Sequence, residues 1–182
     1  QDISLNISRE MLQNNPVIAK IKKGVTGKII NELLNLSKKE NDKYTEFWKN
    51  FGAVIKEGLY DHNEFHDKLL TLLRFKSTIG DDWISLDKYL QLINKNQKEL
   101  YYFSNIEGNN ENLLKSPQLE TFIEKKIPVL FMTDPIDEFW LQNINKYKDK
   151  EFKSITKGSI NLKDKNDIKK KSNINNNIND LI

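Results

Sequence analysis

The stretch IPVLFMTDP, residues 127–135, decides the fold class of this chain. Residues 127–133 are almost continuously apolar, which is typical of a β-strand with both faces covered. Asp134 and Pro135 then open a helix that we expect to run to about Tyr147, because proline favours the first turn of a helix. A buried strand that leads directly into a helix indicates an α/β unit with a parallel sheet.

The segments around this strand continue the alternation of strand and helix. ELYYFS, residues 99–104, is predicted to be a strand, and EFKSIT, residues 151–156, is a candidate last strand. The expected parallel sheet includes residues 100–104 and 128–132, joined by right-handed crossovers. Two helices are predicted from serine caps: one from Ser85 to Ile93, and one from Ser116 with Pro117 at its first position.

Residues 16–75 are predicted to be almost wholly helical. Asn15 caps a helix of about 20 residues, and its apolar residues recur every four positions in one stripe: Val17, Ile21, Val25, Ile29 and Leu33. DKYTEFWKNFGAVIKEG, residues 42–58, is a second amphipathic helix, and Trp48 is expected to be buried on its apolar side. A third apolar helix precedes Arg74, which we interpret as a structural residue that bridges carbonyl groups. STIGDDWIS, residues 77–85, is expected to be a loop.

The composition excludes several classes of function. The 182 residues include no cysteine, so disulfides, thiolate catalysis and cysteine-based zinc sites are absent. A net charge of +3 implies no strong field for polyanions, and no apolar run approaches the length of a membrane span. Because the chain does not begin with methionine, we expect it to be a piece of a longer protein. Residues 159–182 are dominated by asparagine and lysine and are predicted to be a polar linker.

Three short motifs suggest sites that the surrounding residues argue against. KKGVTGK, residues 22–28, lacks the first glycine of a phosphate-binding loop and falls within the predicted first helix. His62 and His66 are one helical turn apart, but no third metal ligand accompanies them, so no metal site is predicted. The aromatic residues 101–103 lack the glycine–aromatic pattern of an RNA-binding strand, and the lysines are interleaved with acids; nucleic acid is not an expected partner.

Arg9 is a more specific candidate. Arg9 and Arg74 are the only arginines among the 29 basic residues, and an arginine differs from a lysine where a planar fork must hold an oxyanion at two points. Gln13 follows at i+4, on the same face of a predicted helix, and could donate a further hydrogen bond. Together the two side chains would suit a phosphate group at the start of that helix. From the residues alone, an ion pair between Arg9 and a nearby carboxylate is an equally good interpretation.

Six segments of the chain, taken in order, resemble the middle domain of the heat-shock-protein-90 family of molecular chaperones. They are LNISREMLQNN, FWKNFGAVIKEGL, LLRFKST, ISLDKYL, SPQLE and VLFMTDPIDEFWLQNINKYKDKEFKSITKG, and the resemblance covers roughly residues 2–158. FWKNFGAVIKEG is more similar to bacterial and organellar members, and QNINKYKDKEF to plastid forms. A plastid-like or mitochondrial form is therefore suspected, although the sequence leaves the compartment, cytoplasm or organelle, undecided.

The resemblance implies an ATP-driven chaperone that assists protein folding. In this family an N-terminal domain binds ATP with Mg²⁺, and a middle-domain arginine that matches Arg9 reaches the γ-phosphate, with Gln13 as its companion. The resemblance further implies client proteins, co-chaperones, and a homodimer formed through a C-terminal domain. ATP hydrolysis is expected of the full-length protein and not of this segment alone. The alternative that the residues leave open is a stand-alone α/β interaction module without nucleotide chemistry.

The implied architecture is a helical coil that joins the end of a larger α/β/α subdomain to a smaller α/β/α subdomain. The corresponding division of the chain is 1–15 for the catalytic loop and helix start, 16–76 for the helical coil, 77–158 for the small subdomain and 159–182 for the linker. Client contact is placed on DEFWLQ, because Pro135, Ile136 and Leu141 compete with its two adjacent aromatic residues for the buried side of the helix, which would leave one aromatic residue exposed. From the residues alone, burial of both aromatic residues is an equally good interpretation. The candidate residues are Glu138, Phe139, Trp140 and Gln142.

Overall fold

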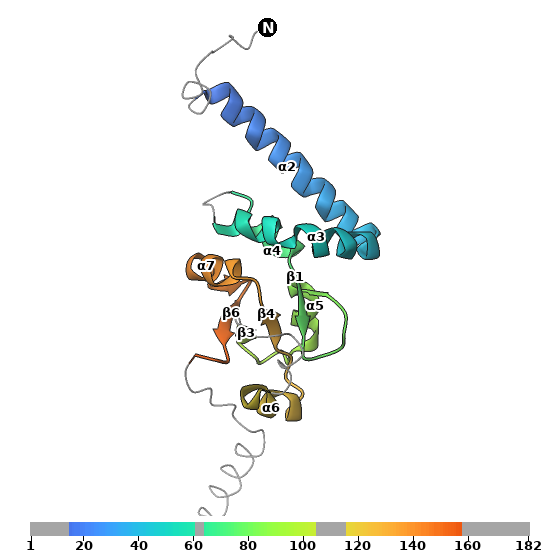
Figure 1. Ribbon diagram of the computed structural model, residues 1–182, viewed down its shortest axis with the longest axis vertical. Helices are drawn as coiled ribbons and strands as arrows, with labels where there is room; N and C mark the ends of the chain where they lie inside the picture. The colour runs from blue at the N-terminus through green and yellow to red at the C-terminus, as the bar shows by residue number, and fades with distance from the viewer. Residues whose placement is uncertain (1–14, 61–63, 105–115, 158–182) are drawn as a thin grey trace, which may run out of the picture.

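The computed structural model describes residues 15–60, 64–104 and 116–157. Three helices come first: α2 (Pro16–Lys39), α3 (Asn41–Tyr60) and α4 (His66–Leu72). The cap predicted for the first of them is confirmed, since Asn15 Oδ1 accepts a hydrogen bond of 2.9 Å from the backbone N–H of Val17. In Figure 1, α2 runs obliquely away from the remainder of the molecule, and α3 and α4 lie between it and the sheet.

Within the described residues, six strands form one sheet in the order β2-β1-β4-β3-β6-β5. Their bounds are β1 (Arg74–Ser77), β2 (Ile84–Ser85), β3 (Glu99–Ser104), β4 (Leu130–Met132), β5 (Lys146–Tyr147) and β6 (Lys150–Ser154). Strand β3 pairs in parallel with both β4 and β6, which confirms the predicted parallel pairing and the candidate last strand, although β4 covers only residues 130–132 of the strand predicted at 127–133. The remaining pairings, β1 with β2 and β4, and β5 with β6, are antiparallel.

Helices cover both faces of this sheet, as the α/β prediction requires. The connecting helices are α5 (Leu86–Leu92), α6 (Pro117–Glu124) and α7 (Ile136–Asn143). Because side chains alternate along a strand, Leu100 packs into a core shared with α3, α5 and α7, whereas Phe103 packs into a second core beneath α6. Figure 1 accordingly shows α7 and α6 on opposite sides of the strands. The helix α7 is thereby enclosed between the sheet and α3.

The predictions were wrong at three boundaries. Residues 74–75 belong to strand β1 and not to a helix, and the expected loop 77–85 carries β1 at one end and β2 at the other. The last predicted helix ends at Asn143, and Tyr147 is already in β5. Strand β1 is made by pairing with a distant segment, for example Lys76 with Phe131, whereas β5 is made by a tight turn that pairs Tyr147 with Lys150 of β6.

The apolar stripe of α2 is largely uncovered in this structure. Val17, Ile21, Val25 and Ile29 are each about half exposed, and Ile30 is the buried residue of the helix. The predicted burial of Trp48 on α3 is confirmed, since this residue is 3% exposed. No helix among the described residues combines the length and apolar character needed to cross a membrane.

Candidate functional site

The helix α7 presents three of the predicted contact residues on its surface and buries the fourth. Phe139 is 52% exposed, Gln142 is exposed and Glu138 is half-buried, whereas Trp140 is fully buried. One of the two adjacent aromatic residues is thus exposed, and the structure identifies it as Phe139. A surface on α7 is consequently made by Glu138, Phe139 and Gln142, while Trp140 belongs to the core.

Trp140 fixes the orientation of this helix. Its indole N–H donates to Asp137 Oδ1 at 2.9 Å, and its ring meets that of Phe152 edge-on with the centroids 5.5 Å apart. Asp137 and Trp140 are three positions apart and therefore lie on the same helix face, the buried one. Phe139 must then point away from the core, because adjacent side chains on a helix diverge by about 100°.

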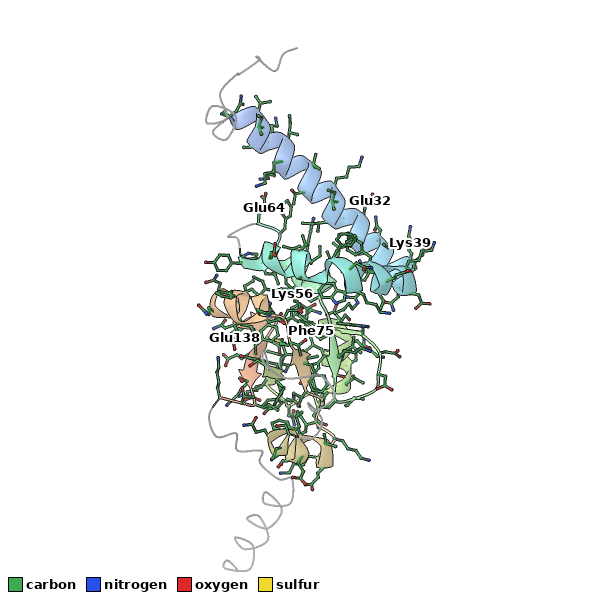
Figure 2. The ribbon with its side chains drawn as sticks, in the orientation of Figure 1. Glu32, Lys39, Lys56, Glu64, Phe75 and Glu138 are labelled. Atoms are coloured by element: carbon green, nitrogen blue, oxygen red, sulfur yellow. The ribbon has the colours of Figure 1, made fainter. Side chains whose placement is uncertain are left out.

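Lys56 joins α3 to α7 from below the surface. Its ammonium donates to Asp137 Oδ2 at 2.8 Å and to Asp134 Oδ2 at 2.7 Å, although only 4% of the lysine side chain is exposed. It also lies 4.9 Å from the centre of the Phe75 ring, a cation–π contact. Figure 2 shows the Lys56 and Phe75 side chains together between α3 and the sheet, with Glu138 beside α7.

Burial dominates the electrostatics of this cluster. Burial raises the pKa of Asp137 above its usual value, and the opposing attraction of Lys56 and the hydrogen bond from Trp140 only partly offset the rise. Two carboxylates face one ammonium, so the cluster carries a negative charge in excess when all three groups are ionised. Water can solvate the carboxylate of Asp134, whose side chain is 46% exposed, but it does not reach the buried carboxylate of Asp137.

An exposed aromatic pair lies above this cluster. The rings of Tyr60, from the last turn of α3, and Phe139 meet edge-on, with centroids 6.3 Å apart and an interplanar angle of 90°. Tyr60 is 53% exposed, nearly the same fraction as Phe139. We refer to Tyr60 and Phe139 as the aromatic ridge, because they form an apolar surface that spans two elements far apart in the sequence.

A cavity of about 370 Å³ opens next to the same lysine. It lies between β1, the end of β4 and the segment 80–83, and Phe75, Trp83 and Phe131 provide aromatic surface around Lys56 and Asp134. Its polar and apolar lining could accommodate one side chain of a bound polypeptide. No function was predicted for these residues from the sequence.

Arg9 and Gln13, the predicted catalytic residues, and His62 lie outside the described residues. The structure does test the interpretation of two other features, residues 22–28 and Arg74. KKGVTGK, residues 22–28, is helical within α2, which is incompatible with a phosphate-binding loop. Arg74 is a structural residue as predicted: one of its terminal nitrogens donates to the carbonyl oxygens of Thr71, Leu72 and Leu73, at 3.2, 3.2 and 2.9 Å.

The sequence analysis missed Lys56 and Tyr60. A signal for Lys56 was present, because Trp48, Gly52 and Lys56 recur every four residues and are all buried, so the lysine stands on the apolar side of α3. A charge in that position calls for a buried partner. No comparable signal exists for Tyr60, whose neighbour Phe139 is brought to it only by folding.

Comparison with known proteins places the chain in a family. The family model described as Hsp90 protein matches residues 1–182. A chaperone protein HtpG from Roseobacter denitrificans is 44% identical over 162 residues, which cover 89% of this chain and 26% of that protein. The HtpG of Wolbachia pipientis is 41% identical over 181 residues, 94% of this chain and 28% of that protein. The chain therefore spans about a quarter of the length of these relatives.

A solved structure agrees with this result. The middle domain of a heat shock protein from Plasmodium falciparum superimposes with a TM-score of 0.68 and is 32% identical. The match covers 78% of this chain and 58% of that one. The described α/β fold is accordingly the fold of an Hsp90 middle domain.

Proposed function

Because this chain belongs to the Hsp90 protein family, we propose that it is the middle segment of an ATP-driven molecular chaperone that assists protein folding and binds unfolded client proteins. The observation that carries the proposal is the family match along all 182 residues. The likeness to a solved middle domain supports it independently, because it is a likeness of fold. The HtpG relatives are bacterial, in agreement with a bacterial or organellar type of chaperone.

The proposed part in ATP hydrolysis falls to Arg9. In the full-length chaperone another domain would hold ATP and Mg²⁺, and Arg9 would contact the γ-phosphate with Gln13 beside it. An arginine in this role stabilises the charge that develops on the transferring phosphoryl group.

The proposed part in client binding falls to the exposed side of α7. Glu138, Phe139 and Gln142 provide an apolar centre with polar neighbours, which suits contact with the mixed side chains of an unfolded chain. The burial of Asp137 and Trp140 supports this assignment, because it fixes the direction in which Phe139 points. Co-chaperones, and a homodimer formed through a further C-terminal domain, remain part of the proposal, as does the division of the chain at residues 15, 76 and 158.

Substitution of Arg9 in the full-length protein tests the nucleotide part of the proposal. We expect Arg9→Ala to lower the ATPase rate by at least about 10-fold, because the transition-state contact is lost. Arg9→Lys should fall between this variant and the wild type, since lysine keeps the charge without the fork, and Gln13→Ala should have a smaller effect. ATP affinity should change little. Turnover is measured with purified protein whose folding is checked by circular dichroism.

The matched control is Lys20→Ala, which removes an exposed cation from α2 without touching the proposed site. It should leave turnover unchanged. If Arg9→Ala folds and hydrolyses ATP at the wild-type rate, Arg9 is a structural residue and the proposed catalytic role is wrong.

A further inference from the structure

The aromatic ridge exposes apolar surface in a rigid arrangement. Tyr60 and Phe139 come from different elements, are each about half exposed and keep an edge-to-face contact. Such pairs are favoured geometries of aromatic rings, and each ring has only two side-chain torsions to restrict. A surface of this kind can accept an apolar partner at a small entropic cost.

The ridge is anchored from beneath on both sides. Lys56 lies one helical turn before Tyr60 on α3, and its buried ion pair with Asp137 ties α3 to α7, the helix that carries Phe139. Trp140 holds the same carboxylate from the other side. The relative position of the two rings is consequently set by the core and does not depend on the exposed contact alone.

Acidic side chains border the ridge. Glu57 is exposed and stands three positions before Tyr60 on α3, while Glu138 is the neighbour of Phe139 on α7. The ammonium of Lys157, whose side chain is exposed, approaches the half-buried Glu138 only to 3.9 Å, at the limit of an ion pair. An apolar centre between carboxylates complements a polypeptide segment in which an apolar residue is flanked by lysine or arginine.

We propose that Tyr60 is a client-contact residue, and that with Phe139 it forms one composite binding surface for unfolded polypeptide segments that carry an apolar side chain between basic residues. The inference rests on the proposed chaperone function and extends its contact surface from α7 onto α3. It also makes Lys56 a positioning residue, because the ion pair with Asp137 holds the two halves of the surface together.

The test measures binding of an unfolded polypeptide to the full-length chaperone. The probe is an unstructured, lysine-rich polypeptide that contains isolated leucines, labelled with a fluorophore and followed by anisotropy. We expect Tyr60→Ala and Phe139→Ala each to weaken binding by about 5- to 30-fold, as is usual when a central aromatic residue of an interface is truncated. The double variant should lose less than the product of the two single effects, because the rings act as one surface. Tyr60→Phe should retain most of the binding.

Phe51→Ala is the matched control. Phe51 also lies on α3, is 51% exposed and packs against another ring, that of Phe47, but it stands on the opposite side of the helix from Tyr60. Its truncation should leave binding unchanged. Equal losses in Phe51→Ala and Tyr60→Ala would overturn the proposal, because they would show a non-specific response to lost apolar surface.

Two peptides test the charge of the partner. They have the same central leucine and are flanked either by lysines or by glutamates. The lysine-flanked peptide should bind several-fold more tightly, and Glu57→Gln should reduce the difference, as should high salt. If the two peptides bound equally well, the inference that the acidic border favours basic flanking residues would be wrong.

The outcomes separate this inference from the function on which it rests. If the wild-type chaperone binds the polypeptide and Phe139→Ala weakens binding while folded Tyr60→Ala does not, the composite surface is wrong and the chaperone function stands. Tyr60→Gln, which keeps a polar helix terminus, decides the matter if Tyr60→Ala does not fold. If the wild-type protein binds no unfolded polypeptide, both proposals fail.

Discussion

Lys56 Nζ and Asp137 Oδ2 lie 2.8 Å apart although 81 positions separate the two residues in the sequence. Both side chains are almost completely removed from solvent. The pair joins α3, which belongs to the helical segment, to α7, which packs on the sheet. It is more buried than the ion pair of Lys56 with Asp134. The stability of this junction should accordingly depend on the pair being complete.

We expect Lys56→Met to destabilise the protein by about 3–5 kcal/mol, because removal of one partner leaves a buried charge uncompensated. Asp134→Asn is the matched variant: Asp134 also binds Lys56, but it is half exposed and its loss should cost less than about 1 kcal/mol. Urea unfolding monitored by tryptophan fluorescence gives both values. Equal losses in the two variants would contradict the assignment of Asp137 as the principal partner.

The cost of Lys56→Met should decrease as the pH is lowered from neutrality toward about pH 4. Burial raises the pKa of Asp137 in the folded state, so at these pH values the native protein binds more protons than the unfolded chain and gains stability as the pH falls. Without Lys56 the buried Asp137 carboxylate has lost its counter-charge, so its protonation raises the free energy of unfolding by more than in the wild type. Unfolding free energies of the variant and the wild type across this range check the expectation, and a deficit independent of pH would exclude it.

Arg74 should not be replaceable by lysine. One of its terminal nitrogens donates to three consecutive carbonyl groups where α4 ends, and the Tyr44 hydroxyl donates to Leu72 O at 2.6 Å. The guanidinium also lies 4.7 Å from the centre of the Tyr44 ring, and a lysine ammonium does not reproduce this planar stacking, so we expect Arg74→Lys to cost about 1–3 kcal/mol of stability. Lys68→Arg, an exposed exchange on α4, is the control and should be nearly neutral. Denaturation midpoints provide the comparison.

Two glycines in helices should respond to alanine with opposite signs. A Cβ at Gly24 meets no heavy atom within 4 Å, so Gly24→Ala should stabilise α2 by about 0.5–1 kcal/mol through helix propensity. A Cβ at Gly52 would lie 2.8 Å from Cε2 of the buried Trp48 ring, so Gly52→Ala should destabilise by about 1–3 kcal/mol. Thermal unfolding distinguishes the signs, and stabilisation by Gly52→Ala would show that the Trp48 ring can move.

Alkaline pH should unfold the protein through its buried tyrosines. Burial raises the pKa of Tyr101 to about 12, and it raises the pKa values of the fully buried Tyr44 and Tyr89 further. Above about pH 10 the native state therefore keeps protons that the unfolded chain releases, and stability falls as the pH rises by up to about 1.4 kcal/mol per unit and tyrosine. Tyrosinate absorbance should appear together with unfolding. A stability unchanged up to about pH 11 would contradict this.

The local part of this fold could be predicted from the sequence because it depends on neighbouring residues. The caps at Asn15 and Ser85, the strand at residues 99–104 and the burial of Trp48 follow from side-chain chemistry and periodicity within one or two turns. The strand after α4 could not be predicted in this way. Its apolar residues continue the pattern of the helix, and it becomes a strand by pairing with β4.

The sequence by itself determined the family and the α/β alternation, and it left open whether either aromatic residue of DEFWLQ is exposed. Only the tertiary structure decided that Phe139 is exposed, that it meets Tyr60, and that a buried lysine joins the two helices that carry these rings. The reason is that either of two adjacent aromatic residues can face the core, and contacts with other parts of the fold decide which of them does. Here the partners are Asp137 and Lys56, and the 81 positions that separate these two residues place the choice beyond any local pattern.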